Sequence, residues 1–477
     1  MSLPLRNFLA GLLLHAALFT GARAASPDAP SPAALRAAIA KSLPIIERSS
    51  AVALHERACF SCHHGAHPSL VLHAAWSRGF NINTHNLEDQ LTRAYRGLIE
   101  DGPRFKEGWS IAGTPDGPGT ALWMLQVAGW KPDAVTAATT AFFLADTKHP
   151  DHWAPAMRRP PTVGSAFTTT FLVLRGLRGF HTAEQAPAAT MRFANARRWL
   201  TATPARDTED SVHRLRALHL MDADDEVFQK ELRELLAMQQ PDGGWPQRPD
   251  TASDGYATGT VLAALYDTRA VPPSAPVVQR ALRYLLITQT AEGSWHVRKR
   301  THDVQPFFDS SFPHGVDQFI SISATSWATY ALLHALPVTE RKPYLARHPA
   351  AADRVLAQAT PPRERNFSVA DFAFYEEKIA PILAAHCLEC HATGSKKAKA
   401  NLHLDTREGV LAGGVSGSVI TPEAPDRSLL LRALLHDNVE QMPPKKALPA
   451  TVIADFRKWI ELAAPMIPKP LSAAPRP

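Results

Sequence analysis

The chain has 477 residues, which is enough for two or three domains with sizeable cores. Hydrophobic residues make up 45% of the chain and charged residues 20%, as is ordinary for a globular protein. The net charge is only +6, and no lysine- and arginine-rich run is suited to phosphate contacts, so we expect no nucleic-acid partner.

Residues 1–24 have the pattern of a cleavable export signal. Arg6 supplies the positive start, residues 8–20 form the apolar stretch, and Ala22-Arg23-Ala24 is a small-residue cleavage site. The apolar stretch is shorter than the roughly 20 residues needed to span a bilayer. We therefore expect a periplasmic protein with no membrane span once the signal is removed.

Residues 25–84 are predicted to form an N-terminal helical segment that carries a haem motif. A helix predicted over about 33–57 leads into Cys59-Phe60-Ser61-Cys62-His63. The C-x-x-C-H spacing is typical of a c-type haem, in which both cysteines form thioethers with the porphyrin and the histidine ligates iron. The sequence thus predicts attachment of a first haem through Cys59 and Cys62, with His63 as an iron ligand.

The sixth ligand of this first haem stays open at the level of the sequence. Candidates are a distant side chain such as Met157 or His314, a water molecule, or no ligand.

Residues 85–337 are predicted to be a chain of helices paired through short turns, with no convincing strand. Apolar residues recur at helical spacing, for example at Phe167, Phe171 and Leu174. Residues 318–336 are apolar almost all round, which predicts a fully buried helix.

A repeat lies within this helical region. The stretch from Gln239 to Trp245 (Gln-Gln-Pro-Asp-Gly-Gly-Trp) matches the stretch from Gln289 to Trp295, 50 residues further on. Each glycine suits the left-handed turn after a helix, and each tryptophan can then pack back over the helix end. Phe142-Phe143 with Trp153, and Glu107-Gly108-Trp109, look like degenerate copies.

The second copy also carries Arg280, Ala281, Tyr284 and Leu285 at the upstream positions of the glutamine-tryptophan motif of squalene-hopene cyclases. The region therefore resembles the prenyltransferase and squalene-oxidase repeat family. That resemblance implies an (α/α) toroid of helical hairpins around a central cavity.

Asp222-Ala223-Asp224-Asp225 resembles the D-x-D-D acid motif of squalene-hopene cyclases. Here it directly precedes a helix predicted over 226–240, where acidic residues cap backbone N–H groups and complement the helix dipole. Glu226-Val227 also replaces the Thr-Ala that follows the cyclase motif. We interpret the acidic stretch as a helix start.

His314 and Asp317 lie in a loop before the most apolar helix. If that helix lines the toroid, the two side chains are candidate catalytic, proton-handling groups facing the cavity. The structural alternative is that they cap the helix that begins at Gln318.

Residues 338–368 are predicted to be a flexible linker, followed by a haem-binding domain at 369–468 and a tail at 469–477. A helix over 371–385 leads into Cys387-Leu388-Glu389-Cys390-His391. Cys387 and Cys390 are predicted to attach a second c-type haem, with His391 ligating its iron. Met442 is the predicted sixth ligand, because a thioether closes the iron and raises its reduction potential.

The order of these elements, with Pro425-Asp426-Arg427, Met442-Pro443-Pro444 and a last helix over 450–463, resembles the planctomycete-type cytochrome c family. The N-terminal haem motif, with Arg159-Pro160-Pro161 and Phe312-Pro313-His314-Gly315, resembles exported proteins that join such a motif to a squalene-cyclase-like toroid.

Together these features predict an all-α protein, in which an (α/α) toroid of helical hairpins is joined to a small cytochrome c-like domain. The favoured function is periplasmic electron transfer with a redox partner protein, through two covalent haems, with the toroid as a scaffold or binding module. The alternative is a haem oxidoreductase acting on an apolar or polycyclic substrate in the cavity. A third possibility is that the toroid docks another protein. An open iron face pointing into a sizeable apolar cavity would favour the enzyme. A six-coordinate first haem beside a toroid filled by side chains would favour the carrier.

Overall fold

The computed structural model describes residues 29–56, 62–106, 110, 115–155, 159–222, 225–301, 307–346, 367–393, 395, 402–414, 419–422, 425–436, 441–444 and 446–466. Within these ranges the fold is all-α, as predicted, apart from one two-stranded antiparallel ladder. The ladder pairs β1 (Trp245–Pro246) with β2 (Ser253–Asp254). No helix among the described residues is both long and apolar enough to cross a bilayer.

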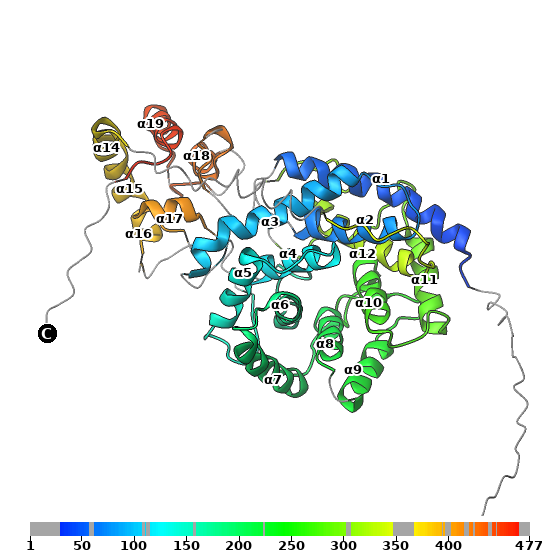
Figure 1. Ribbon diagram of the computed structural model, residues 1–477. Coiled ribbons are helices and arrows are strands. Elements are labelled where there is room, and N and C mark those ends of the chain that lie inside the picture. The colour runs from blue at the N-terminus through cyan, green and yellow to red at the C-terminus, as the bar shows by residue number, and fades with distance from the viewer. Residues whose placement is uncertain are drawn as a thin grey trace, which may run out of the picture.

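Six helices form a closed inner ring, in which each packs against the next and the last returns to the first (Figure 1). They are α2 (His67–Ser77), α4 (Asp116–Val127), α6 (Ala166–Phe180), α8 (Thr208–Leu220), α10 (Gly255–Thr268) and α12 (Gln318–His334). Outside them lie α1 (Pro32–Glu56), α3 (Thr84–Lys106), α5 (Ala134–Ala145), α7 (Ala186–Ala202), α9 (Asp225–Ala237) and α11 (Pro276–Thr288). The ring is therefore an (α/α) toroid.

The hydrophobic patterns explain which helices lie inside. The outer helix α11 buries Val278, Ala281, Leu282 and Leu285, which form one stripe at helical spacing. The inner helix α12 is instead buried on nearly every side, because it packs against α10, α2 and α1.

Inner helices approach one another closely where glycine is present. A Cβ atom added at Gly259 of α10 would lie 2.6 Å from the backbone of Trp327 and Ala328 on α12. The α10–α12 crossing therefore depends on the missing side chain.

The predicted repeat is confirmed, because three tryptophans make the same pair of hydrogen bonds. Each Nε1 donates to a carbonyl oxygen ten residues upstream: Trp153 to Phe143 at 3.0 Å, Trp245 to Leu235 at 2.8 Å, and Trp295 to Leu285 at 3.0 Å. Each backbone N–H donates to a threonine of the next inner helix: Trp153 to Thr170, Trp245 to Thr258, and Trp295 to Thr325. The degenerate copy ending at Trp153 is thus a true copy, whereas residues 107–109 lie outside the described residues.

The glutamines of the repeat show how the ring closes. Gln239 donates through Nε2 to the Val277 carbonyl oxygen, in the first turn of α11, at 2.9 Å. Gln289, the equivalent residue, donates to the Ala38 carbonyl oxygen of α1 at the same distance. Helix α1 therefore takes the next outer position after α11. The α1–α2 hairpin, which we expected in a separate segment at 25–84, is part of the toroid.

The predicted linker begins later than residue 338. Residues 338–346 pack on the toroid, where the Lys342 carbonyl oxygen accepts from Trp76 Nε1 at 2.9 Å and the Ala346 N–H donates to the Ala128 carbonyl oxygen at 2.9 Å. The Arg341 guanidinium also lies 4.3 Å from the centre of the Trp76 ring. The sequence pattern did not predict this packing, because polar side chains and backbone groups, rather than an apolar stripe, hold residues 338–346 on the toroid. Residues 347–366 lie outside the described residues.

The C-terminal part is a second, small helical unit. It contains α14 (Val369–Phe374), η4 (Tyr375–Ile379), α15 (Ala380–His386), α16 (Leu388–His391), α17 (Arg407–Ala412), η5 (Pro425–Arg427), α18 (Leu429–Leu434) and α19 (Ala450–Glu461). Its separate core is built around Leu383, Leu431, Phe456, Trp459 and Ile460. The Arg104 side chain of α3 donates to the Leu411 carbonyl oxygen of α17 at 3.1 Å, which joins this unit to the toroid.

Candidate haem sites and the toroid interior

The C-terminal haem motif forms one helical turn. The backbone N–H groups of Cys390 and His391 both donate to the Cys387 carbonyl oxygen, at 3.1 and 2.9 Å. No disulfide joins Cys387 to Cys390, and burial raises the pKa of the Cys387 thiol to about 11. The His391 side chain is buried. Two thiols and an imidazole along one turn are the donor set of a covalently attached haem, so these residues fit that group.

The surroundings of this motif also fit a porphyrin. Cys387 and Leu388 pack against an apolar core that includes Leu404, Val419 and Leu430. Met442, in the segment between α18 and α19, is partly buried, and its N–H donates to the Ala433 carbonyl oxygen at 3.1 Å. Ligation of iron by Met442 stays a prediction.

The last two residues of the N-terminal haem motif, Cys62 and His63, begin η1 (Cys62–Ala66), which leads directly into α2. The His63 Nε2 atom lies 3.1 Å from the Thr162 hydroxyl, in the loop between α5 and α6. Burial, aided by the charge of Arg159, lowers the pKa of His63 to about 4, which favours the neutral imidazole that metals bind. Cys59 and Met157 lie outside the described residues, so His63 and its surroundings carry the fit with a haem here.

Two further histidines of this hairpin contact residues of the ring, and His64 is buried whereas His67 is partly buried. The His64 ring lies 5.7 Å from the Phe308 ring and 5.4 Å from the Phe319 ring. His67 Nδ1 lies 3.1 Å from the hydroxyl of Ser323 on α12. Burial lowers the pKa of His67 to about 3, and the charges of His63 and Arg216 act in the same direction. The hairpin that carries the N-terminal motif thus faces the interior of the ring.

Four side chains from four inner helices pack against one another inside the ring. The guanidinium carbon of Arg216 lies 5.7 Å from the Trp123 ring centre, 5.8 Å from that of Phe171 and 5.1 Å from that of Trp327. These four residues, from α8, α4, α6 and α12, are each no more than 5% exposed. Arg216 also pairs with Asp267 at 3.0 Å. A charged group and three aromatic rings therefore pack together among four of the six inner helices.

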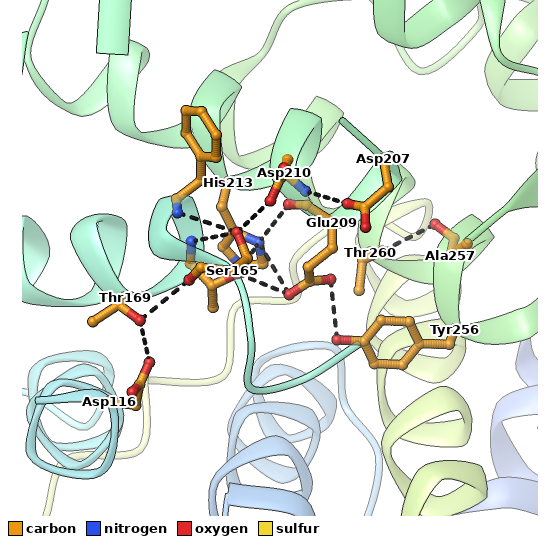
Figure 2. Close-up of polar contacts among 12 residues, drawn as sticks. Asp116, Ser165, Thr169, Asp207, Glu209, Asp210, His213, Tyr256, Ala257 and Thr260 are labelled. Atoms are coloured by element: carbon orange, nitrogen blue, oxygen red, sulfur yellow. Dashed lines mark hydrogen bonds and ion pairs between the residues drawn. The ribbon is translucent and has the colours of Figure 1, made fainter. Parts of the chain in front are cut away.

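Buried acidic residues gather where the inner helices begin (Figure 2). Glu209, in the first turn of α8, accepts a hydrogen bond from Thr168 at 3.0 Å and another from the Tyr256 hydroxyl at 3.2 Å. Burial raises the pKa of Glu209 to about 8. Asp116, at the start of α4, accepts a hydrogen bond from Thr169 at 2.5 Å. Both carboxyl groups therefore accept hydrogen bonds from uncharged hydroxyl groups.

Sequence reasoning missed Glu209, and it considered the acidic stretch at 222–225 instead. The Asp222 side chain is 87% exposed, lies 3.8 Å from Arg178 and follows the end of α8, whereas Ala223 and Asp224 lie outside the described residues. In the sequence, Glu209 is one of several acidic residues at the start of a helix, and this pattern normally indicates helix capping. Only the packing of α8 against α6 and α10 turns that start inward.

The structure does not place His314 and Asp317 in the toroid interior. His314 Nε2 lies 2.8 Å from the Ser294 hydroxyl, and its ring stacks on that of His296 at 4.5 Å. Asp317 accepts from His296 Nε2 at 2.9 Å and from the Lys299 N–H at 3.0 Å. Both residues are partly exposed, and they join the turn after α11 to the start of α12. Neither side chain caps α12 through a hydrogen bond.

Comparisons with solved structures find two partial likenesses. The solved structure of type II terpene cyclase MstE from Scytonema aligns with a TM-score of 0.42 and 14% identity, over 64% of this chain and 98% of that chain. A glycosidase structure aligns with a TM-score of 0.40 and 14% identity, over 63% of this chain and 98% of that chain. No curated protein matches the sequence.

Two family models match separate parts of the chain. Residues 168–344 match the squalene-hopene cyclase C-terminal domain, and residues 387–446 match planctomycete cytochrome C. The chain therefore joins a cyclase-like helical toroid to a planctomycete-type cytochrome c domain.

Proposed function

We propose that the protein is an exported dihaem c-type cytochrome that carries electrons in the periplasm. One haem is attached through Cys59 and Cys62 and is ligated by His63. The other is attached through Cys387 and Cys390 and is ligated by His391. The toroid serves as the scaffold of the first haem, and a redox partner protein supplies or accepts the electrons.

The tight packing of side chains inside the ring is the observation that favours an electron carrier over a substrate-binding enzyme. A site for an apolar or polycyclic substrate needs a cavity that buries most of the ligand surface. Here Trp123, Phe171, Arg216 and Trp327, which come from four inner helices, are each at most 5% exposed. A substrate of that size would have to displace an aromatic side chain and separate Arg216 from Asp267. A rigid, packed interior instead suits a scaffold that holds a redox group without reorganising.

The surroundings of the two histidines support a carrier as well. His391 is buried beside an apolar core, which lowers the local dielectric and excludes water. His63 belongs to a hairpin that closes the inner ring, so the toroid fixes its orientation through α2, α12 and the loop that carries Thr162. When bound, the two haems would supply the one-electron chemistry, and the chain would supply position and insulation.

The test uses the full chain matured in a host that attaches haem. Reductive titration should take up two electrons per chain, reversibly and without an organic substrate. Two double variants are the matched controls: Cys59→Ala/Cys62→Ala should remove one electron, and Cys387→Ala/Cys390→Ala should remove the other. If the first haem were reoxidised only when an organic compound was turned over, the carrier assignment would fail.

The haem oxidoreductase remains the second candidate, and one observation favours it. Glu209, His213 and Tyr256 place a protonated carboxyl, an imidazole and a phenol inside the toroid that holds His63. Carbon monoxide binding distinguishes the two functions. A first haem that binds carbon monoxide rapidly when reduced has the exchangeable iron an enzyme needs, whereas a carrier with a closed iron binds it slowly or not at all.

A further inference from the structure

Two arginines of the inner ring lie beside the same tryptophan. The guanidinium carbon of Arg175, on α6, lies 5.1 Å from the centre of the Trp123 ring, and that of Arg216, on α8, lies 5.7 Å from it. The Arg216 side chain is 1% exposed, whereas Arg175 is partly exposed. Two like charges are thus held close together in an interior where electrostatic repulsion is poorly screened.

The carboxylate that faces these two cations is Asp267 of α10. It lies 3.0 Å from Arg216 and also accepts a hydrogen bond from the Tyr330 hydroxyl at 3.4 Å. His334, whose ring lies 4.0 Å from that of Tyr330, adds no charge at neutral pH because burial lowers its pKa to about 4. Arg175, Arg216 and Asp267 therefore carry one positive charge in excess.

Several buried nitrogen atoms of this cluster have no hydrogen-bond partner among the described residues. They are Nε, Nη1 and Nη2 of Arg216, Nε of Arg175, and Nε1 of Trp327, whose ring lies 5.9 Å from that of Trp123. The contact between Arg216 and Asp267 is thus an ion pair without hydrogen-bond geometry. Because buried donors are nearly always paired, these N–H groups favour an acceptor from outside the chain.

Two structural alternatives explain only part of this arrangement. Aromatic faces attract guanidinium groups, but they leave the N–H groups without an oxygen acceptor. Helix C-termini also favour cations, but this effect is confined to the last turn. The basic residue in the last turn is Arg178 in α6 and His219 in α8, so Arg175 and Arg216 lie before it.

A third arginine, Arg78, adds positive charge and does fit the second alternative. Its charge acts on His334 in the same direction as that of Arg216. Arg78 directly follows α2, and its Nη1 donates to the Ala74 carbonyl oxygen of that helix at 3.1 Å. The C-terminal end of α2 therefore partly neutralises Arg78, which leaves Arg175 and Arg216 as the cations in excess.

We propose that Arg175 and Arg216 form a binding site for a small organic monocarboxylate, which enters from the partly exposed side of Arg175. A guanidinium group matches the two oxygens of a carboxylate with two parallel N–H groups. A singly charged anion balances the excess of one positive charge, whereas a doubly charged phosphate would reverse it. The site goes beyond electron carrying and does not need a haem at either motif.

The size of the ligand is consistent with the packed interior. A carboxylate group binds at the edge of the cluster through Arg175, so Trp123 and Trp327 keep their places. A polycyclic substrate would instead have to displace them. The site therefore adds a binding role to the scaffold without requiring a large cavity.

The experiment follows thermal unfolding of the full chain, produced in a haem-attaching host, while sodium acetate replaces sodium chloride at constant ionic strength. The midpoint temperature should rise and then level off, because a ligand that binds only the folded state stabilises it. Isothermal titration calorimetry gives the dissociation constant. Sodium phosphate is the second probe, and it should bind about tenfold more weakly, because its second charge is not balanced.

Replacing Arg175 tests the site directly. Arg175→Gln should weaken acetate binding by about 10- to 100-fold, because charge-assisted hydrogen bonds are lost. Arg175→Lys keeps the charge but not the paired N–H groups, so its affinity should lie between those of Arg175→Gln and wild type. Arg178→Gln is the matched control, since Arg178 lies on the same helix but is 51% exposed and 3.8 Å from Asp222. It should bind acetate as the wild type does.

Three results would overturn the proposal: no saturable effect of acetate, equal affinity in Arg175→Gln and wild type, or tighter binding of phosphate than of acetate. A haem also carries carboxylates, so Cys59→Ala/Cys62→Ala is titrated in parallel. Equal acetate binding by this variant and the wild type is expected for a free carboxylate. Binding seen only in the variant would assign the arginines to the haem and contradict the proposal.

Discussion

The guanidinium carbon of Arg216 lies 5.1 Å from the centre of the Trp327 ring, and this pair joins α8 to α12, which α10 separates in the ring. A buried cation is tolerated there because aromatic faces attract it and Asp267 neutralises it. The interior is therefore a structural core, in which loss of a ring leaves a void.

Replacing the central ring tests that role. Trp327→Ala should lower the free energy of unfolding by about 3–5 kcal/mol, because a large buried side chain is lost and a cavity remains. Urea denaturation followed by circular dichroism measures it. Ile287→Ala is the matched control, since Ile287 is 71% exposed on α11, and it should change stability by less than about 0.5 kcal/mol. Equal stability of Trp327→Ala and wild type would mean that the centre is loosely packed.

Two glycine substitutions should change the stability of the toroid in opposite directions. Gly259→Ala should destabilise the toroid by about 1–3 kcal/mol, because its Cβ would meet backbone atoms of α12 that cannot move independently. Gly117→Ala in α4 has nothing within 4 Å of the added Cβ, and it should stabilise by up to about 1 kcal/mol through helix propensity. Thermal unfolding of both variants measures the two changes, and the same sign for both would contradict the α10–α12 packing.

His213 should make the protein sensitive to acid. Burial lowers its pKa from 6.5 to about 3, so between those pH values the unfolded chain binds a proton that the folded chain does not. Stability should therefore fall as the pH falls through this window, by up to about 1.4 kcal/mol per pH unit. The His213→Gln variant cannot bind this proton. The slope of its unfolding free energy against pH should therefore be smaller by the contribution of about one proton. An unchanged slope between about pH 6 and pH 4 would show that other titrating groups cause the acid sensitivity.

Met442 should control the C-terminal haem. Met442→Ala should abolish the weak near-infrared band of methionine-ligated ferric haem and lower the midpoint potential, because a thioether favours the reduced iron. Spectra and potentials of the full chain measure both effects. Met466→Ala is the matched control, since Met466 is buried in the core of the same unit. A spectrum that Met442→Ala leaves unaltered would refute this ligand.

Local patterns predicted the helices and the repeat well. The helix predicted over 450–463 is α19, and the glycine of each repeat copy has the expected left-handed backbone, with φ of 90° at Gly243 and 96° at Gly293. Such features depend on residues close in sequence. Ring closure by α1 depends on Gln289 reaching Ala38, a contact between residues 251 positions apart, which no local pattern encodes.

The candidate sites show the same difference between local features and contacts made by residues far apart in the sequence. The haem motifs are contiguous in the sequence and could be predicted. The buried environment of Glu209 could not be predicted, because Thr168, His213 and Tyr256 converge on it only after three helices pack. The contact of His314 with Ser294 could not be predicted either, because the loop before α12 sets the position of His314.

Haem stoichiometry tests the central claim most directly. Intact-mass spectrometry of the mature chain, produced in a haem-attaching host, should show two covalent haem additions. Cys59→Ala/Cys62→Ala should lose one of them, and Cys387→Ala/Cys390→Ala the other. A wild-type chain with a single haem addition, unaffected by replacing Cys59 and Cys62, would contradict the dihaem account.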